Sequence, residues 1–164
     1  MDELKVYLVN LGRYNENEPT GAWFTLPLDY DQVRETLKLD ATHEEYAIHD
    51  YELPIKISEY ESLERLNRIY HAATTISETP FYPIINDLVE AWFTSIEDLA
   101  ENLDELHMYQ GDVTDLARRI VDEGVFGDVS DNLKFYIDFQ RLGEVMLIDG
   151  NYLETTAGLV EYSG

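Results

Sequence analysis

The chain of 164 residues carries 34 Asp and Glu against 11 Lys and Arg, which gives a formal net charge of −23 at pH 7. A field of this sign disfavours binding to nucleic acid or to an anionic membrane surface, and it steers the chain towards basic partners. Because 45% of the residues are hydrophobic and 12% are aromatic, the chain can form a core and is not a disordered acidic tail.

The first part of the sequence predicts a small α+β unit. Apolar runs bounded by Gly, Pro and polar clusters indicate strands. An apolar pair four residues apart, Val33 and Leu37, indicates an amphipathic helix that begins near Asp29. Pro54 ends the last strand. The expected elements are strands at residues 5–11 and 22–28, joined by a polar loop, then a helix at residues 29–39 and a strand at residues 45–53.

The middle part predicts three helices. The first is expected to begin at Ser58, which Glu61 follows at capping-box spacing, and the third at Ser95, which Asp98 follows at the same spacing. Prolines favour a turn before the second helix, at residues 84–93. The apolar positions expected to face the core are Leu63, Leu66 and Ile69 in the first helix and Ile96, Leu99, Leu103 and Leu106 in the third.

The last part predicts another α+β unit. One helix is expected to end at Gly124, and a second to begin at the N-cap Ser130 and to end before Gly143. The Asp-Gly-Asn run at residues 149–151 is a hairpin signal between two or three strands within residues 145–162. The helix positions expected to point inward are Leu116, Ile120 and Val121, followed by Leu133, Tyr136 and Ile137.

These elements predict the α+β class, in an elongated chain of three small domains. The domains are an N-terminal α+β domain at residues 1–57, an acidic helical domain at 58–110 and a C-terminal α+β domain at 111–164. The sequence has no cysteine, which excludes disulfides and thiolate chemistry. It has neither an N-terminal signal pattern nor 18 consecutive apolar residues, so we expect a soluble cytoplasmic protein.

No catalytic motif is present. The phosphate-binding loop, the dinucleotide fingerprint, the zinc-protease helix, the nucleophile elbow and the EF-hand loop are all absent from the sequence. His49 is next to Asp50, but adjacent residues of a strand point to opposite faces. We therefore expect no enzyme activity, no cofactor and no metal site, with all histidines at surface or half-buried positions: His43, His49, His71 and His107.

The strongest local signal is a helix face crowded with acids. From Ile69 to Ala117 there is no Lys or Arg, but there are ten Asp and Glu. Glu101 stands three or four residues from four other acids, and such neighbours cost about 0.2–0.5 kcal/mol each. The total of roughly 1–2 kcal/mol is small against a domain stability of roughly 5–15 kcal/mol, yet selection for stability alone would intersperse lysines. A basic partner would relieve this repulsion.

The amount of charge matches that of duplex DNA. DNA carries one negative charge per about 1.7 Å of axis, so 23 net charges correspond to roughly 39 Å of duplex, and a compact chain of this length is about 40 Å across. Imitation of DNA requires an elongated chain or an acidic ridge. The alternatives are an acidic surface that serves only solubility, an acidic adaptor for another basic DNA-binding protein, and a carboxylate-metal enzyme.

Two N-terminal blocks resemble the ArdA antirestriction family of conjugative plasmids and transposons. The first runs from N-L-G-x-Y-N-E at residues 10–16 to G-A-W-F at residues 21–24, and the second is E-Y-A-I-H-D-Y-E-L-P at residues 45–54. The stretch at residues 123–146 is similar to the one regarded as the family's antirestriction motif. In the middle of the chain, the acidic helical character matches.

This resemblance implies an elongated, curved, three-domain protein that dimerises through its C-terminal domain and mimics bent B-form DNA. The implied partners are type I restriction-modification enzymes, whose methyltransferase and specificity core it would occupy in the cytoplasm of a bacterial host, without binding nucleic acid or membrane itself. Incoming DNA would be protected. The acids expected to stand in for phosphates are Glu59, Glu61, Glu64, Asp87, Glu90, Glu97, Asp98, Glu101, Asp104, Glu105, Asp112 and Asp115, with Glu44, Glu45, Asp50 and Glu52 next.

The homodimer implied by the resemblance needs an apolar surface in the C-terminal domain. Five apolar and aromatic residues there can form it, or can instead form the core of that domain: Val125, Phe126, Phe135, Tyr136 and Phe139.

Overall fold

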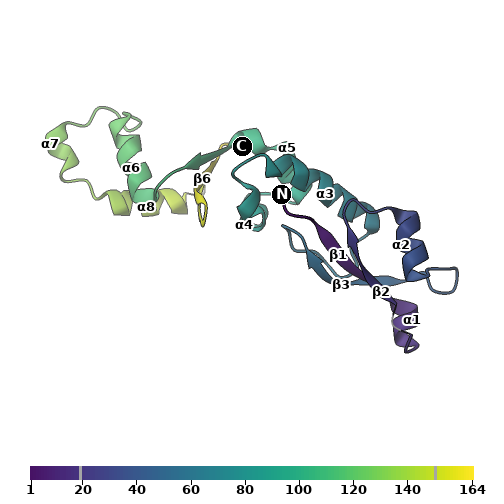
Figure 1. The fold of residues 1–164 in the computed structure, drawn as a ribbon. Coiled ribbons are helices and arrows are strands. Elements are labelled where there is room, and N and C mark those ends of the chain that lie inside the picture. The colour runs from purple at the N-terminus through teal and green to yellow at the C-terminus, as the bar shows by residue number, and fades with distance from the viewer. Residues whose placement is uncertain (19, 150) are drawn as a thin grey trace.

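The computed structural model describes residues 1–18, 20–149 and 151–164. Its described part is mixed α+β, with eight α-helices and two three-stranded antiparallel sheets, so the predicted fold class is confirmed. Figure 1 shows an elongated molecule, with one sheet near one end, a helical lobe at the other and helices between them.

The N-terminal sheet has the strand order β2-β1-β3. Both pairings are antiparallel, and Val6, Leu8 and Phe24 point inward and are buried. All three strands and the helix after the second one were predicted. Their bounds are Lys5–Asn10 for β1, Gly21–Thr25 for β2, Tyr30–Leu37 for α2 and Tyr46–Glu52 for β3.

The predicted polar loop after β1 begins instead with a short helix, α1 at Leu11–Asn15. Asn10 caps this helix, because its side-chain oxygen accepts a hydrogen bond from the Arg13 N–H at 3.1 Å. The Asn10 amide group also donates to the Leu37 carbonyl at 2.9 Å. One fully buried Asn therefore ties the first strand to the end of α2.

Three α-helices and two 3-10 turns form the middle of the chain. Their bounds are Leu63–Ser77 for α3, Tyr82–Ile84 for η1, Ile85–Trp92 for α4, Ile96–Glu101 for α5 and Leu103–Glu105 for η2. Ser95 caps α5 as predicted. The first helix was placed too early, because its cap is Ser62, which accepts from the Arg65 N–H, and not Ser58.

The third helix of this part is shorter than predicted. The backbone of Asn102 leaves the helical region, at φ −122° and ψ 22°, and its side chain donates back to the Asp98 carbonyl at 2.8 Å. The helix therefore ends at Glu101, and Leu106 begins a strand that the sequence analysis missed.

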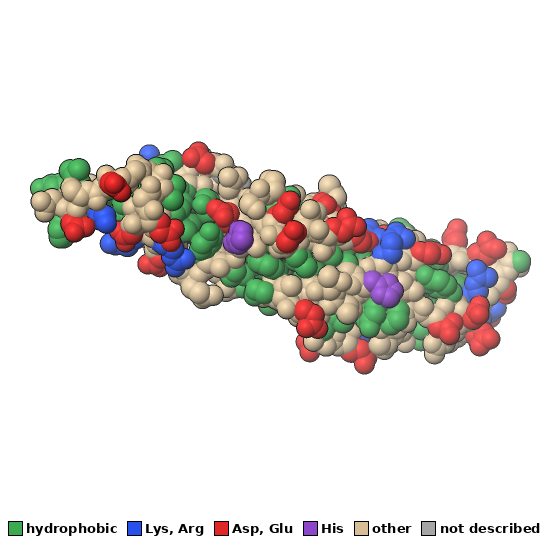
Figure 2. All heavy atoms as spheres, turned by 90° about the horizontal axis from the view of Figure 1, so that it is seen from above, with side chains coloured by type: hydrophobic (Ala, Val, Ile, Leu, Met, Phe, Trp, Pro, Cys, Tyr) green, Lys and Arg blue, Asp and Glu red, His purple; other side chains and the backbone are tan. Residues whose placement is uncertain are grey.

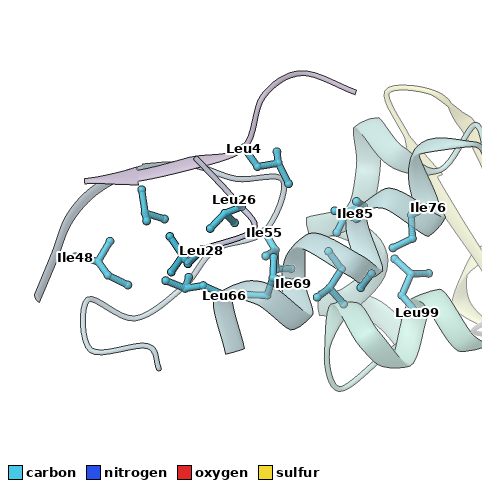
Figure 3. Close-up of a cluster of buried hydrophobic side chains, with 14 of the residues drawn as sticks. Leu4, Leu26, Leu28, Ile48, Ile55, Leu66, Ile69, Ile76, Ile85 and Leu99 are labelled. Carbon is cyan, nitrogen blue, oxygen red and sulfur yellow. The ribbon is translucent and has the colours of Figure 1, made fainter. Parts of the chain in front are cut away.

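One continuous apolar cluster joins the N-terminal sheet to these helices. Figure 3 shows Leu26 and Leu28 against Leu66 of α3, and the same cluster continues through Ile85 of α4 to Leu99 of α5. Because the first two predicted domains share this core, the arrangement of three separate domains is not confirmed, and the boundaries at 57 and 110 stay a prediction.

The second sheet has the order β4-β6-β5 and draws its strands from distant parts of the chain. Leu106 of β4 pairs with Tyr162 of β6. The last strand of the chain therefore pairs with the strand that directly follows the helical middle part. A smaller cluster of Val113, Leu116 and Leu159 joins this sheet to the helical lobe. The bounds are Leu106–Tyr109 for β4, Val113–Asp122 for α6, Asp131–Lys134 for α7, Phe139–Ile148 for α8, Tyr152–Thr155 for β5 and Gly158–Tyr162 for β6.

The single helix predicted from Ser130 is two helices. Ser130 caps α7 as expected, but the chain leaves the helix and Asp138 caps α8. Gly143, expected beyond a helix end, is buried inside α8, where it lies against the Val113 backbone. Leu133 and Tyr136, expected to point inward, are 59% and 86% exposed, so these assignments were wrong.

The strands of the C-terminal part are also shifted. Residues 145–148, expected to form a strand, belong to α8. The hairpin joins β5 to β6, with Thr155 opposite Gly158, so its turn lies at Thr156 and Ala157. The predicted turn at residues 149–151 includes Gly150, which lies outside the described residues.

Candidate protein-interaction surface

Negative charge is spread evenly along the elongated chain. Residues 1–57 hold 12 acids and 5 bases, residues 58–110 hold 11 and 2, and residues 111–164 hold 11 and 4. The three parts therefore contribute net charges of −7, −9 and −7. Figure 2 shows acidic side chains recurring along the whole length of one face.

The sixteen acids expected to contact a partner are all accessible, and none is buried. Four of them are half-buried: Glu61, Glu97, Asp98 and Glu105. The other twelve are exposed. Within the described residues, seven make neither a salt bridge nor a side-chain hydrogen bond: Glu44, Glu45, Glu59, Glu64, Asp87, Glu101 and Asp104.

Glu97 has a structural role that the sequence analysis did not identify. Arg65 Nε of α3 donates to Glu97 Oε1 of α5 at 2.8 Å, and Arg68 Nε lies 3.8 Å from the same oxygen. Glu61 lies 3.7 Å from Arg65. Two bases of α3 thus pair with an acid of α5, and Glu97 is only partly available to a partner.

Other acids cap helices. Asp98 accepts hydrogen bonds from the Thr94 N–H at 3.0 Å and from its hydroxyl at 3.3 Å. Asp112 and Asp115 form a reciprocal capping box at the start of α6. Asp112 and Asp115 are exposed and Asp98 is half-buried, so a capping role and a contact role are compatible.

The carboxylates also affect neighbouring tyrosines. The pKa of Tyr162 lies above its ordinary value, first because of desolvation and then because of the Glu105 and Asp98 charges. The pKa of Tyr46 is raised in the same direction, mainly by burial and further by Glu64 and Glu61. The negative charges that would attract a basic partner thus also oppose deprotonation of Tyr162 and Tyr46.

The histidines do not gather into a catalytic or metal centre. His43 is half-buried, with Nε2 at 3.1 Å from Glu16 and Nδ1 at 3.3 Å from Asp40, while His49, His71 and His107 are exposed. Among the residues that the structure describes, no group of three or more His, Asp or Glu is arranged to hold a metal ion. In the same part of the chain, no helix combines the length and apolarity needed to cross a membrane.

The C-terminal lobe carries a second kind of surface, which is apolar. Phe135 is 89% and Phe126 61% exposed, and Val125 and Tyr136 are also exposed. Phe139 is half-buried beneath Arg118, whose guanidinium carbon lies 4.7 Å from the ring centroid. The four exposed residues do not form the lobe's core. Ile148, 81% exposed, was missed because its segment was assigned to a strand.

A family model described as "Antirestriction protein (ArdA)" matches residues 6–161 of the chain, which is nearly its whole length. A search of curated proteins found no match.

Proposed function

Because the chain belongs to the ArdA antirestriction protein family, we propose that it mimics B-form DNA and occupies the DNA-binding groove of type I restriction-modification enzymes. The partner is the methyltransferase and specificity core, whose groove must be basic to bind phosphates. Inhibition is by occupancy, so no bond is made or broken and no cofactor is needed. Incoming unmodified DNA is protected in the recipient cell, including DNA carried by plasmids and conjugative transposons.

The observation that carries this proposal is the even spread of exposed carboxylates along an elongated body. A compact acidic protein would present its charge on all sides, whereas DNA presents a repeating charge along a line. Net charges of −7, −9 and −7 in successive parts of the chain approximate such a line. Seven of the proposed contact acids have no intramolecular partner among the described residues, so they are free to pair with lysines and arginines of the groove.

The apolar surface of the C-terminal lobe supports a homodimer. A group of large exposed apolar residues marks an interaction site. Phe135 and Tyr136 directly follow α7, which lies at the end of the molecule farthest from the N-terminal sheet (Figure 1), and Phe126 lies between α6 and α7. Pairing two lobes would double the length of the acidic body. Light scattering coupled to size-exclusion chromatography should find a dimer for the wild type and a folded monomer for Phe126→Ala and Tyr136→Ala.

The proposed mimicry is tested by competition. Increasing amounts of the protein are added to a purified type I methyltransferase core bound to a labelled duplex recognition site, over a salt series. We expect displacement at low salt, and we expect the affinity of the protein for the enzyme to fall as salt rises in the way that the affinity of DNA does, because both ligands bind through many charge pairs that salt screens. No displacement at low salt contradicts the proposal for that enzyme, and capture of another basic protein would then favour the adaptor alternative.

Because the proposed contacts are distributed over many acids, we also expect each single substitution to have a small effect. Replacing Glu101 alone by Gln should change the competing concentration less than about fivefold, since one exposed pair contributes about 0.2–1 kcal/mol. Replacing Glu64, Asp87, Glu101 and Asp104 together should weaken competition far more than any single change. A single substitution that abolished competition in a folded protein would contradict distributed mimicry.

A further inference from the structure

The outer face of the N-terminal sheet carries a cluster of aromatic side chains. The inner face packs on the core with α3 (Figure 3). On the outer face, the strand register places Trp23 of β2 opposite Tyr7 of β1, and Tyr7 opposite Asp50 of β3. In the next row Lys5 lies opposite Glu52. Two aromatic rings therefore lie beside two carboxylates on one side of the sheet.

The rings have a defined geometry. Tyr7 and Trp23 meet edge to face, with centroids 5.5 Å apart and planes at 64°. A Cβ on Gly21 would lie 2.8 Å from the Tyr7 hydroxyl, so this glycine leaves room for the tyrosine to lie across β2. Tyr14 of α1 meets His49 edge to face, with centroids 5.4 Å apart, at the same end of the molecule. Trp23 and Tyr14 are 43% and 49% exposed.

The chain itself places a cation on this face. Lys5 Nζ lies 5.0 Å from the Trp23 ring centroid and 3.6 Å from Glu52 Oε2. An ammonium group held between a ring and a carboxylate shows that the field here favours positive charge. Trp23 remains nearly half exposed, so a second cation can reach its ring.

We propose that this outer sheet face, defined by Tyr7, Trp23, Asp50 and Glu52, receives arginine side chains from the basic surface of the restriction-modification enzyme. The inference rests on the proposed function and adds a contact that depends on shape. A guanidinium group stacks on an aromatic ring and pairs with a carboxylate at once, which an ammonium group does less well. The aromatic rings would thus distinguish an arginine-lined groove from an equally charged lysine-lined one.

The local charge favours a protein partner over a nucleic acid. Aromatic residues on a sheet also stack on the bases of single strands, but such sites have basic surroundings. Here Asp50 and Glu52 lie in the face and Glu3, which accepts from the Thr25 hydroxyl at 3.2 Å, lies at its edge. These carboxylates repel phosphates and attract guanidinium groups.

The first test uses the competition assay with the methyltransferase core. Trp23→Thr removes the ring and keeps a residue that suits a strand, Trp23→Phe keeps a ring, and Tyr60→Thr removes a 64% exposed aromatic outside the sheet. We expect about tenfold weaker competition for Trp23→Thr, partial recovery for Trp23→Phe and less than twofold change for Tyr60→Thr. If the wild type does not compete, the proposed function fails. If it competes and Trp23→Thr matches it, only this inference fails.

A second test needs no enzyme. In a Trp92→Phe background, Trp23 is the only tryptophan, and its fluorescence is followed during titration with hexa-arginine or with hexa-lysine. We expect a response to hexa-arginine at several-fold lower concentration, and a stronger response after Lys5→Gln frees the ring. Equal responses to the two peptides overturn the inference, as does a response to a single-stranded oligonucleotide in place of hexa-arginine.

Discussion

Gly143→Ala tests the close contact between α8 and α6. A Cβ at this position would lie 2.6 Å from the Val113 carbonyl oxygen and 2.8 Å from its carbonyl carbon. Both are backbone atoms at the start of α6, so no side-chain rotation can make room. The helices must separate, and overpacking of this kind costs about 1–3 kcal/mol.

A second effect of the same substitution has the opposite sign. Glycine in a helix interior is about 1 kcal/mol less favourable than alanine, so Gly143→Ala would stabilise α8 if the site were open. The contact should outweigh this gain, because the clash involves several atoms of rigid backbone. We expect a net loss of about 1–2 kcal/mol, which corresponds to a fall in melting temperature of roughly 2–8 °C for a chain of this length.

Thermal unfolding followed by circular dichroism, with urea unfolding beside it, measures the loss. Glu144→Ala is the matched control, because its exposed side chain makes only a 3.8 Å pair with Arg141 and a 3.4 Å hydrogen bond from the Gln140 amide group, and its loss should stay within about 0.5 kcal/mol. Gly143→Val should lower stability further than Gly143→Ala. An alanine variant as stable as the wild type, or more stable, would show that α6 and α8 do not approach this closely in solution.

Further predictions concern the other packed polar contacts. Arg65→Ala should cost about 1–2 kcal/mol by urea unfolding, because it breaks the 2.8 Å bond to half-exposed Glu97, whereas Glu101→Ala should stay within about 0.5 kcal/mol; equal losses would contradict a clamp between α3 and α5. Asn10→Ala should cost about 2–3 kcal/mol, since it leaves buried backbone groups without partners, and a neutral result in the same assay would contradict that role. Burial, then the Glu161 hydrogen bond and charge, raises the pKa of Tyr152 above its ordinary value of 10.0. The folded state therefore holds this proton more tightly, so the contribution of Tyr152 to stability should be constant below about pH 10 and fall above it, and the fall above pH 10 should be smaller in Tyr152→Phe; an unchanged pH dependence above pH 10 in that variant would refute the assignment.

Local signals predicted much of the fold correctly. The caps Asp29, Ser95 and Ser130 each satisfy backbone N–H groups of the helix that follows, and this chemistry needs no distant partner. The strands of the N-terminal sheet could be predicted from their apolar runs, which Gly, Pro and polar residues bound. Ser58 was a false start because Ser62, four residues later, offers the same chemistry next to the apolar stripe.

The errors lie where distant residues decide the structure. β4 is only four residues long, and its partners in β6 are at least fifty residues away, so its own sequence gives little indication of a strand. Gly143 matched the pattern of a helix end, but it serves close packing against Val113, which no local pattern reveals. Leu133 of α7 and Tyr136 after it matched a buried helix face, whereas both are exposed.

The candidate surface was predictable in kind but not in detail. Composition indicated an excess of unpaired acids, and the charge along the chain follows from counting. The role of Glu97 could not be predicted, because Arg65 reaches it from another helix. The aromatic outer sheet face depends on the register that brings Trp23 and Tyr7 together, which is visible only once the strands are paired.

The pairing of β4 with β6 sets an order of events during synthesis. β4 leaves the ribosome fifty residues before Leu159, its first partner in β6, and at 5–20 residues per second this amounts to a wait of roughly 3–10 s. Throughout that time the edge of β4 that pairs with β6 lacks its partner, and Val160 has not yet joined the main core. The lobe of α6 to α8 must form within this interval, because its residues lie between β4 and β6 in the sequence. After the lobe, the chain comes back to β4 and pairs with it as β6. Completion of the molecule's middle is therefore a late step, and a nascent chain stalled within the lobe would expose an unfinished sheet to other chains.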